Sequence, residues 1–328
     1  EGAHRPVHAS NAIQGRQPAR AVLGSLFLAP RSSTIPLAMS EGFVYLNGRL
    51  VPASEARVSV FDYGLLYGLS LYETVRAYQG MPFRLANHLA RLERGAGRLG
   101  IPFPPEGLDL AGAIHMTLTA NGLSDARVRI TLTAGEGRGA PSSPPDGPPN
   151  LFISAAPLAP PTEEEYERGH KAIISAIRRS SLSVASRLKT GDLVENMLAR
   201  REATEKGADQ AILLNEKRCV AECAAANIFF VGYGRIQTPS LDCGLLPGVT
   251  RDALIGLALG RNMPVDERWV HGEEIWDAEE VFVTSATLGV FPVTSINGRP
   301  IRGATPGKVT RALTMAYRDL VKEELGLR

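Results

Sequence analysis

The pattern of apolar and polar positions at the start of the chain predicts strands joined by tight turns. Residues 43–46 and 49–51 lie on either side of Asn47-Gly48. Asn-Gly readily adopts the positive φ angles of a two-residue turn, so these segments are expected to form a β-hairpin. A second hairpin is predicted at 72–78 and 81–84, on either side of Gln79-Gly80.

Helical and strand spacing then alternate along the chain. Leu89, Leu92, Ala96 and Leu99 recur at helical spacing, which predicts a helix after His88. A helix over 192–206 is expected to turn Leu193, Met197 and Ala203 inward. Strands are predicted at 126–134, 151–155, 172–177, 211–214, 227–231 and 280–284, helices at about 249–260 and 306–325, and a turn at Asn297-Gly298.

A stretch rich in glycine and proline divides the chain. Residues 135–150 read GEGRGAPSSPPDGPPN, a composition typical of a loop or linker. We therefore expect an interdomain linker at 135–150, between a small N-terminal α/β domain at 39–134 and a larger C-terminal α/β domain at 151–328. The mixed sheet of the larger domain is expected to curl toward a barrel, with the active site between the two domains.

Composition excludes several classes of protein. The 328 residues are 44% hydrophobic, enough for two cores at roughly 150 residues per domain. The 36 basic and 34 acidic residues are nearly balanced and show no basic cluster with interleaved aromatics, so nucleic acid is not an expected partner. No apolar run approaches the roughly 20 residues that span a bilayer, so no membrane association is expected. Cys219, Cys223 and Cys243 lack CxxC spacing, which predicts buried, reduced thiols and no metal site.

Residues 1–38 are left unassigned. They contain four arginines, one acidic residue and the short apolar stretch at 21–29, a composition typical of a targeting segment. The chain begins with Glu1, however, and Met39 stands directly before the first strand pattern. Sequence upstream of the true start is therefore an equally good interpretation.

Three segments carry candidate chemistry. Lys189, in SRLKTGDLVENMLA, lies among apolar and cationic neighbours, where desolvation would lower the pKa of its amine as Schiff-base chemistry requires. Glu222 opens ECAAANIFF, where small neighbours let a carboxylate approach the edge of a flat ring. If the ring is a pyridine, Glu222 would keep its nitrogen protonated. Residues 244–252, GLLPGVTRD, form a turn into a helix whose free N–H groups suit a phosphate.

Each segment alone has an ordinary structural interpretation. An isolated lysine before a helix is most often a surface residue, and a Pro-Gly helix start is often only a turn. Residues 95–100 match GxGxxG but follow a helix, whereas a dinucleotide site must follow a strand and open a helix. A nicotinamide oxidoreductase and a non-catalytic binding protein are the alternatives from other classes. Lys189 argues against the binding protein.

The order of Lys189, AECAAANIF, LPGVTRD and VFVTSATLGVFPVTSINGRPI resembles the class IV aminotransferases, which are the fold-type IV pyridoxal-phosphate enzymes. The resemblance runs from about Phe43 to Leu320. The family comprises branched-chain aminotransferases, D-amino-acid aminotransferases and aminodeoxychorismate lyases. The resemblance implies a two-domain, D-amino-acid aminotransferase-like α/β fold, pyridoxal 5'-phosphate as cofactor and a homodimer, which we expect to be cytoplasmic.

The resemblance also implies roles for individual residues. Lys189 would form the Schiff base and move the proton, and Glu222 would pair with the pyridine nitrogen. Arg91, in NHLARL, would bind the phosphate from the small domain. The remaining cofactor residues would be Asn227, Val249, Thr250, Ser285, Ala286 and Thr287.

The substrate side leaves two activities open. YGLSLYETVR at 67–76 resembles the branched-chain enzymes and would place Tyr67, Tyr72 and Arg76 near the substrate. Thr74 departs from that pattern, because branched-chain enzymes have glycine there and the lyases have a threonine that assists proton transfer. Val194 stands where branched-chain enzymes have tyrosine, and Ala134 where D-amino-acid aminotransferases have arginine.

We expect a transaminase that acts on a branched-chain-like amino acid and a 2-oxo acid. The alternative is 4-amino-4-deoxychorismate lyase, which releases pyruvate and 4-aminobenzoate. Both reactions use a lysine as the acid–base group.

Overall fold

The computed structural model describes residues 2, 42–103, 108–137 and 143–328. All the elements that follow belong to one compact unit, which ends at Arg328. The interpretations of residues 1–38 lie outside the described residues, apart from Gly2.

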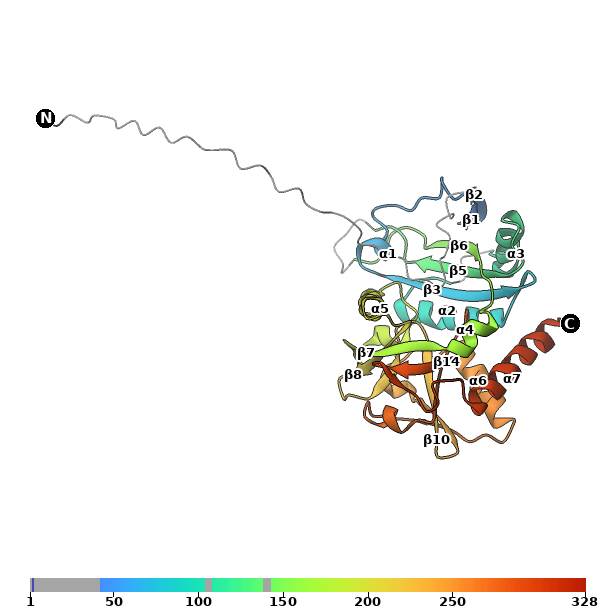
Figure 1. Cartoon of the computed structure of the whole chain (residues 1–328). Helices are drawn as coiled ribbons and strands as arrows, with labels where there is room; N and C mark the ends of the chain where they lie inside the picture. Colours follow the sequence, from blue (N-terminus) through green and yellow to red (C-terminus); the bar gives the residue numbers. More distant parts are fainter. Residues whose placement is uncertain (1, 3–41, 104–107, 138–142) are drawn as a thin grey trace. The chain divides into compact units, whose positions relative to one another are not determined.

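The first sheet has six antiparallel strands in the order β2-β1-β6-β5-β3-β4 (Figure 1). Both predicted hairpins are confirmed. Asn47 and Gly48 have φ angles of 47° and 96°, and Gln79 and Gly80 of 48° and 79°, as a two-residue turn with positive φ angles requires. The strands are β1 (Phe43–Leu46), β2 (Arg49–Pro52), β3 (Ser70–Tyr78), β4 (Met81–Pro82), β5 (Ala126–Thr133) and β6 (Asn150–Pro157).

Two helices cover one face of this sheet. α2 (Leu85–Leu99) packs on β3, and α3 (Leu110–Ala120) packs on β1 and β6. The helix predicted after His88 is α2, which begins slightly earlier than expected, at Leu85. The sequence did not predict α3. Leu92 and Ala96 of α2 are buried, as the helical spacing predicts. Gly95 packs against Leu71, and Gly100 ends α2 with φ 68°, so the GxGxxG match belongs to helix packing and helix termination.

The strand expected to open the second domain lies in the first sheet. β6 pairs with β5 along its whole length and also with β1. The segment 134–149 therefore connects two neighbouring strands, with Asn150 already in β6, and the chain passes to the second sheet only at residues 158–169. The expected linker position is wrong because a long loop within a sheet and a linker between domains share the same Gly- and Pro-rich composition.

The second sheet has nine strands in the order β12-β11-β10-β13-β14-β7-β8-β9, with β15 paired to β14. The pairs β14–β7, β7–β8 and β11–β12 are parallel, so the sheet is mixed as predicted. The strands are β7 (His170–Arg179), β8 (Gln210–Asn215), β9 (Val220–Cys223), β10 (Asn227–Gly232), β11 (Arg235–Pro239), β12 (Val265–Arg268), β13 (Glu280–Ser285), β14 (Gly289–Ile296) and β15 (Arg299–Pro300).

This sheet curls toward a barrel. Cys223, at the end of β9, forms an isolated bridge with Ala226 directly before β10, which brings one end of the sheet back to its middle. Side chains from β8, β10 and β13, such as Ile212, Ile228 and Val283, share one inner core. Every residue of β10 is buried, because both of its faces are covered.

Helices cover the outside of the curled sheet. Phe229 and Phe282 stack in an outer core with Leu254 of α6 and Leu313 of α7. α5 packs on β7 and β8 through Ala199 and Ala203. The other helices are α1 (Tyr63–Leu66), α4 (Glu163–Arg168), α5 (Val194–Glu205), α6 (Val249–Leu259), α7 (Lys308–Leu325) and the 3-10 helices η2 (Val184–Arg187), η3 (Leu241–Cys243) and η4 (Glu274–Asp277).

The inward face of α5 differs from the expected one. Ala203 is buried, but Met197 is 63% exposed and Leu193 lies before the helix at its N-cap, half-buried. The helix begins at Val194, and Ala199 and Ala203, four residues apart, form its buried line. Small side chains allow α5 to lie close to the sheet, which leaves the larger apolar side chains outside.

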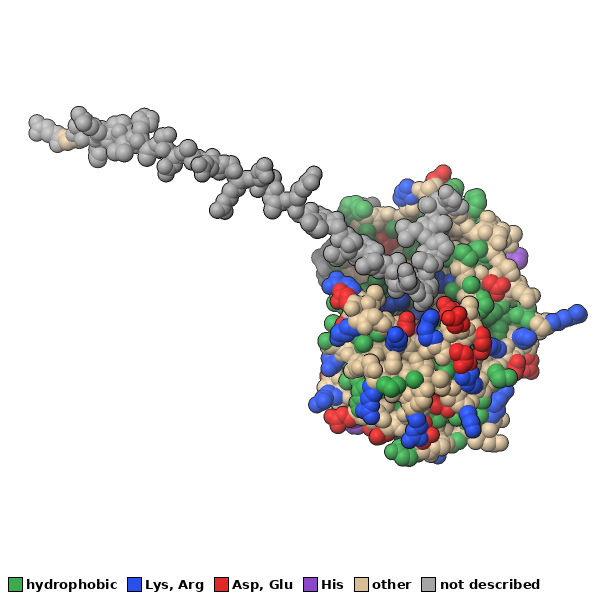
Figure 2. Space-filling view, in the orientation of Figure 1, with side chains coloured by type: hydrophobic (Ala, Val, Ile, Leu, Met, Phe, Trp, Pro, Cys, Tyr) green, Lys and Arg blue, Asp and Glu red, His purple; other side chains and the backbone are tan. Residues whose placement is uncertain are grey.

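The surface agrees with the composition. On the face drawn in Figure 2, acidic and basic side chains are interspersed. None of the helices in the described part of the chain is long and apolar enough to cross a membrane. The same residues contain no group of three or more His, Cys, Asp or Glu side chains that could hold a metal ion. Cys219, Cys223 and Cys243 are free and buried, as predicted.

Candidate active site

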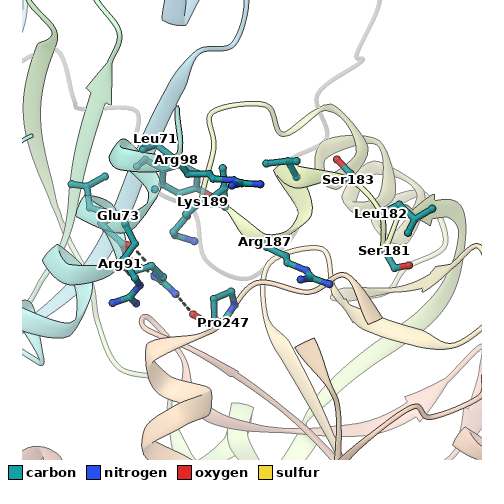
Figure 3. Close-up of a pocket in the computed structure, with 16 residues that line it drawn as sticks. Leu71, Glu73, Arg91, Arg98, Ser181, Leu182, Ser183, Arg187, Lys189 and Pro247 are labelled. Atoms are coloured by element: carbon teal, nitrogen blue, oxygen red, sulfur yellow. Dashed lines mark hydrogen bonds and ion pairs between the residues drawn. The ribbon is translucent and has the colours of Figure 1, made fainter. Parts of the chain in front are cut away.

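A cavity of about 550 Å³ lies where the first sheet and α2 meet the segments before α5 and α6. Figure 3 shows Lys189, Arg91 and Pro247 reaching it from three different segments. Three of the predicted site residues, Lys189, Arg91 and Tyr72, are thereby brought together. The residues that line the cavity are Leu71, Tyr72, Glu73, Arg91, Leu92, Arg94, Gly95, Arg98, Ser181, Leu182, Ser183, Val184, Arg187, Leu188, Lys189 and Pro247.

Backbone pairing holds Lys189 at the start of β3. Its carbonyl accepts a hydrogen bond from the Tyr72 N–H at 2.8 Å, and Thr190 forms an isolated bridge with Leu71. The Nζ atom lies 4.5 Å from the centroid of the Tyr72 ring, an arrangement that suits a cation–π contact. Tyr72, expected on the substrate side, therefore lies against the candidate reactive amine.

Arg129 of β5 was not singled out from the sequence. Its guanidinium carbon lies 3.9 Å from the centroid of the same Tyr72 ring, and burial lowers its pKa. In the register of β3 and β5, Arg129 stands opposite Thr74, so both share the sheet face that carries Tyr72 and Arg76. The alternation of charged and apolar residues in ARVRITLT could have pointed to Arg129. It did not single this residue out, because a charged side chain on the outer face of a strand is usually solvated.

Glu222 lies on β9 and is buried. Burial raises the pKa of its carboxyl, while Arg179, the Leu246 N–H, Lys189 and Arg91 each oppose this increase. The Leu246 N–H donates to Oε2 at 3.2 Å and the Asn227 amide donates to the same oxygen at 3.3 Å. Lys189, Arg91 and Glu222 thus share one electrostatic environment.

Arg179 of β7 is the partner of Glu222 that sequence reasoning missed. Its Nε atom lies 3.3 Å from Glu222 Oε1 and donates to the Gly244 carbonyl at 3.1 Å. A second nitrogen donates to the Ser186 carbonyl at 3.1 Å. Arg179 therefore ties Glu222 to the turn before α6 and to the segment that leads to Lys189.

Arg91 of α2 is held in place by Glu73. Two guanidinium nitrogens donate to the two carboxylate oxygens at 2.7 Å each, and a third donates to the Pro247 carbonyl at 2.8 Å. His88 lies 2.7 Å from Glu73 Oε2. Burial alone would raise the pKa of Glu73, but Arg91 and His88 outweigh it and lower the pKa to about 2.

The start of α6 lies close to Arg91, which donates to the Pro247 carbonyl, and the first N–H groups of a helix have no partner within it. Among the described residues no side chain caps the helix at Gly248, the N-cap residue, so the N–H groups of Val249 and Thr250 keep their helix-end polarity. A Cβ atom on Gly248 would lie 2.0 Å from Asn227 Oδ1. Asn227 itself donates to Leu246 O at 3.0 Å, so its amide positions the turn and Glu222.

The turn between β13 and β14 carries the three remaining predicted cofactor residues. Ser285, Ala286 and Thr287 are half-buried there. Arg76 of β3 donates to the Thr287 carbonyl at 3.0 Å, which attaches this turn to the first sheet. Arg76 stacks on Tyr78, 4.4 Å from the ring centroid. The hydroxyl of Thr284 is buried without a hydrogen-bond partner among the described residues.

Tyr67 lies apart from this group. It ends α1, its ring packs edge-on against Tyr63 at 4.9 Å, and it is 46% exposed. Tyr67 does not line the cavity. Its substrate role remains a prediction that the geometry of this chain does not support.

The donor set fits a phosphorylated, ring-shaped aldehyde such as pyridoxal phosphate. Lys189 and Arg91 line one cavity together with Pro247, which comes directly before the N-cap of α6. Glu222 does not line this cavity, but it is buried close enough for both cations to act on its carboxyl. The buried hydroxyl of Thr284, which has no partner among the described residues, adds a free polar group, and the close approach of Asn227 leaves no space for a side chain at Gly248. Helix starts and arginines are common phosphate ligands.

Comparison with known proteins agrees with this arrangement. The model of the family described as amino-transferase class IV matches residues 70–296. The chain therefore belongs to the class IV aminotransferase family, as the resemblance implied.

Relatives of known name point in two directions. A putative branched-chain-amino-acid aminotransferase of Methanocaldococcus jannaschii is 34% identical over 84% of this chain and 96% of its own length. An aminodeoxychorismate lyase of Bacillus subtilis is 32% identical over 85% of this chain and 94% of its own length. A branched-chain aminotransferase of Thermoproteus uzoniensis, solved with norvaline, matches with a TM-score of 0.78 and 30% identity, over 86% of this chain and 95% of that one.

Proposed function

We propose that this chain is a pyridoxal-phosphate-dependent aminotransferase that moves an amino group between a branched-chain-like amino acid and a 2-oxo acid. The observation that carries the proposal is that Lys189 and Arg91, from distant segments, line one cavity, and that both lie close enough to the buried Glu222 to oppose the rise of its pKa. The branched-chain names of similar proteins support the substrate class.

Each of the three residues has a defined task. When bound, pyridoxal phosphate supplies an electron sink for the carbon that gains or loses the amino group. Lys189 would bind the cofactor covalently and carry the proton at Nζ. Glu222, kept from water and faced by Arg179, would hold a proton at the ring nitrogen. Arg91, Val249, Thr250, Ser285, Ala286 and Thr287 would hold the phosphate.

The substrate would lie against the sheet face of Tyr72, Thr74, Arg76 and Arg129. A guanidinium beside an aromatic ring in a partly buried site binds carboxylates well, because it offers paired donors and keeps its charge. We propose Arg129 as the group that binds a substrate carboxylate.

The direct test traps the cofactor on its lysine. The protein is mixed with pyridoxal phosphate, reduced with borohydride and digested, and mass spectrometry is expected to find the adduct on Lys189. K189A should show no adduct and no glutamate formation from branched-chain amino acids with 2-oxoglutarate. K206A, at an exposed lysine that follows α5, is the control and should behave as wild type. An adduct-free wild type would contradict the proposal.

Aminodeoxychorismate lyase is the second candidate. Thr74 on the substrate face and the Bacillus subtilis relative support it. The two activities separate in one assay, because a lyase releases pyruvate from aminodeoxychorismate without any amino acceptor. Pyruvate release that is lost in T74V, with no glutamate formed from branched-chain amino acids, would replace the transaminase proposal.

We also propose that the protein is a cytoplasmic homodimer. Val60, Phe61, Leu65 and Leu66 are each about half exposed or more and lie together before and within α1. Such a group of exposed apolar side chains is typical of an interface. The three free thiols fit a reducing compartment. Light scattering after size exclusion tests the dimer, and F61D with L65D should shift it toward monomer.

A further inference from the structure

A second group of cations lines the cavity beyond the residues given roles above. Arg94 and Arg98 come from α2, and Arg187 comes from η2. Arg91, Arg94 and Arg98 are separated by three and four residues, so they lie along one side of the helix. α2 therefore presents a row of guanidinium groups to the cavity, of which only Arg91 is held by Glu73.

These cations have little compensating charge. Among the described residues, Glu73 is the only carboxylate in the cavity lining, and Arg91 occupies both of its oxygens. Arg94 and Arg98 form no hydrogen bond or ion pair with any described residue. Arg187 lies 3.3 Å from Asp242, but the two side chains are 51% and 75% exposed, and such surface pairs are weak.

The geometry leaves room between the two sides of the mouth. In Figure 3 the side chain of Arg98 extends from α2 toward the segment of Ser183, while Arg187 lies on the other side of the cavity with its guanidinium directed away from Arg98. Ser183 precedes η2 and makes no side-chain capping bond. The walls include Leu182 and Val184, which are apolar and 87% and 53% exposed.

We propose that Arg94, Arg98 and Arg187 form a binding site for a small dianion at the mouth of the cavity, distinct from the Arg91 and α6 site. Planar guanidinium groups recognise phosphate and carboxylate oxygens in pairs, so a phosphate or a dicarboxylate is the ligand class. This site goes beyond the proposed function, because it requires no reaction at Lys189.

The test measures binding of two non-reacting probes to the protein saturated with pyridoxal phosphate. Inorganic phosphate and succinate are titrated separately by calorimetry at constant ionic strength set with chloride. We expect saturable binding of at least one probe and an affinity at least tenfold lower in the double variant R94Q/R98Q. Saturation by phosphate alone identifies a phosphate ligand, and saturation by succinate identifies a dicarboxylate.

The control is R200Q/R201Q, which removes two arginines from α5, outside the cavity, and should bind the probes as wild type does. The site is overturned if neither probe saturates, if both double variants weaken binding equally, or if the probes act only by displacing the cofactor, seen in its absorbance. The calorimetry does not depend on turnover, so it gives its answer even if no amino-transfer activity is found.

Discussion

The guanidinium of Arg91 and the carboxylate of Glu73 form a buried, two-point ion pair, with both nitrogen–oxygen distances at 2.7 Å. The pair joins α2 to β3 directly beneath the candidate phosphate site. Because Glu73 has no exposed surface, its charge depends entirely on Arg91 and His88.

Lowering the pH should reduce the stability of the folded protein, because Glu73 becomes protonated. The folded-state pKa of about 2 lies below the usual 4.5, so the carboxylate stabilises the fold above pH 4.5, and this contribution is lost as the pH falls toward 2. A shift of this size corresponds to roughly 3 kcal/mol. Urea unfolding between pH 7 and pH 3 should show a smaller pH dependence in E73Q, together with lower stability at pH 7. E93Q, at an exposed position of α2, is the control; wild type and E73Q with the same pH dependence would contradict the assignment.

Removing the charge of Glu222 should lower the rate of turnover strongly while the protein still folds. In E222Q the amide keeps the shape but cannot balance Arg179 or hold a proton at a ring nitrogen. We expect the rate constant for amino transfer to fall by about 10²- to 10³-fold, the usual cost of losing a preorganised charge at the reacting group. Circular dichroism and steady-state kinetics measure the two effects. D266N, in an exposed pair with Arg235, should keep full activity, and an E222Q rate within threefold of wild type would remove Glu222 from its role.

Replacing two glycines of the α6 region by alanine should change the stability of the protein in opposite directions. A Cβ atom at Gly248 would lie 2.0 Å from Asn227 Oδ1, whereas one at Gly256 would meet nothing within 4 Å. G248A should cost about 1–3 kcal/mol and weaken pyridoxal-phosphate binding, because Asn227 positions Glu222. G256A should instead stabilise the protein by about 0.5–1 kcal/mol and leave binding unchanged. Thermal unfolding and cofactor titration check both. Equal effects of the two substitutions would contradict the close approach.

The three cysteines should resist modification until the protein unfolds. Burial raises the pKa of Cys219, Cys223 and Cys243, and the thiolate is the reactive form. With Ellman's reagent at pH 8 we expect no fast-reacting thiol in the native protein and three in urea. One thiol that reacts within the first minute in the native protein would show that a cysteine is accessible.

The amino-acid sequence alone determined the features that depend on interactions between residues close together in the chain. Asn47-Gly48 and Gln79-Gly80 set their hairpins because few other dipeptides tolerate two positive φ angles. The order of Lys189, Glu222 and the Pro247-Gly248 turn pointed to the cofactor class because each motif is contiguous and its chemistry is local. The alternation of strands and helices was likewise readable from spacing.

Only the tertiary structure decided which distant charges meet. Glu73, Arg129 and Arg179 lie within strands, where a charged side chain is ordinarily solvated, and their partners come from elements far along the chain. β6 joined the first sheet because strand pairing depends on the register of neighbours that sequence spacing does not encode. Met197 stayed outside because the small side chains of Ala199 and Ala203 allow closer packing of α5. Burial and pairing are properties of the assembled fold, and they convert ordinary strand residues into the supports of a reactive site.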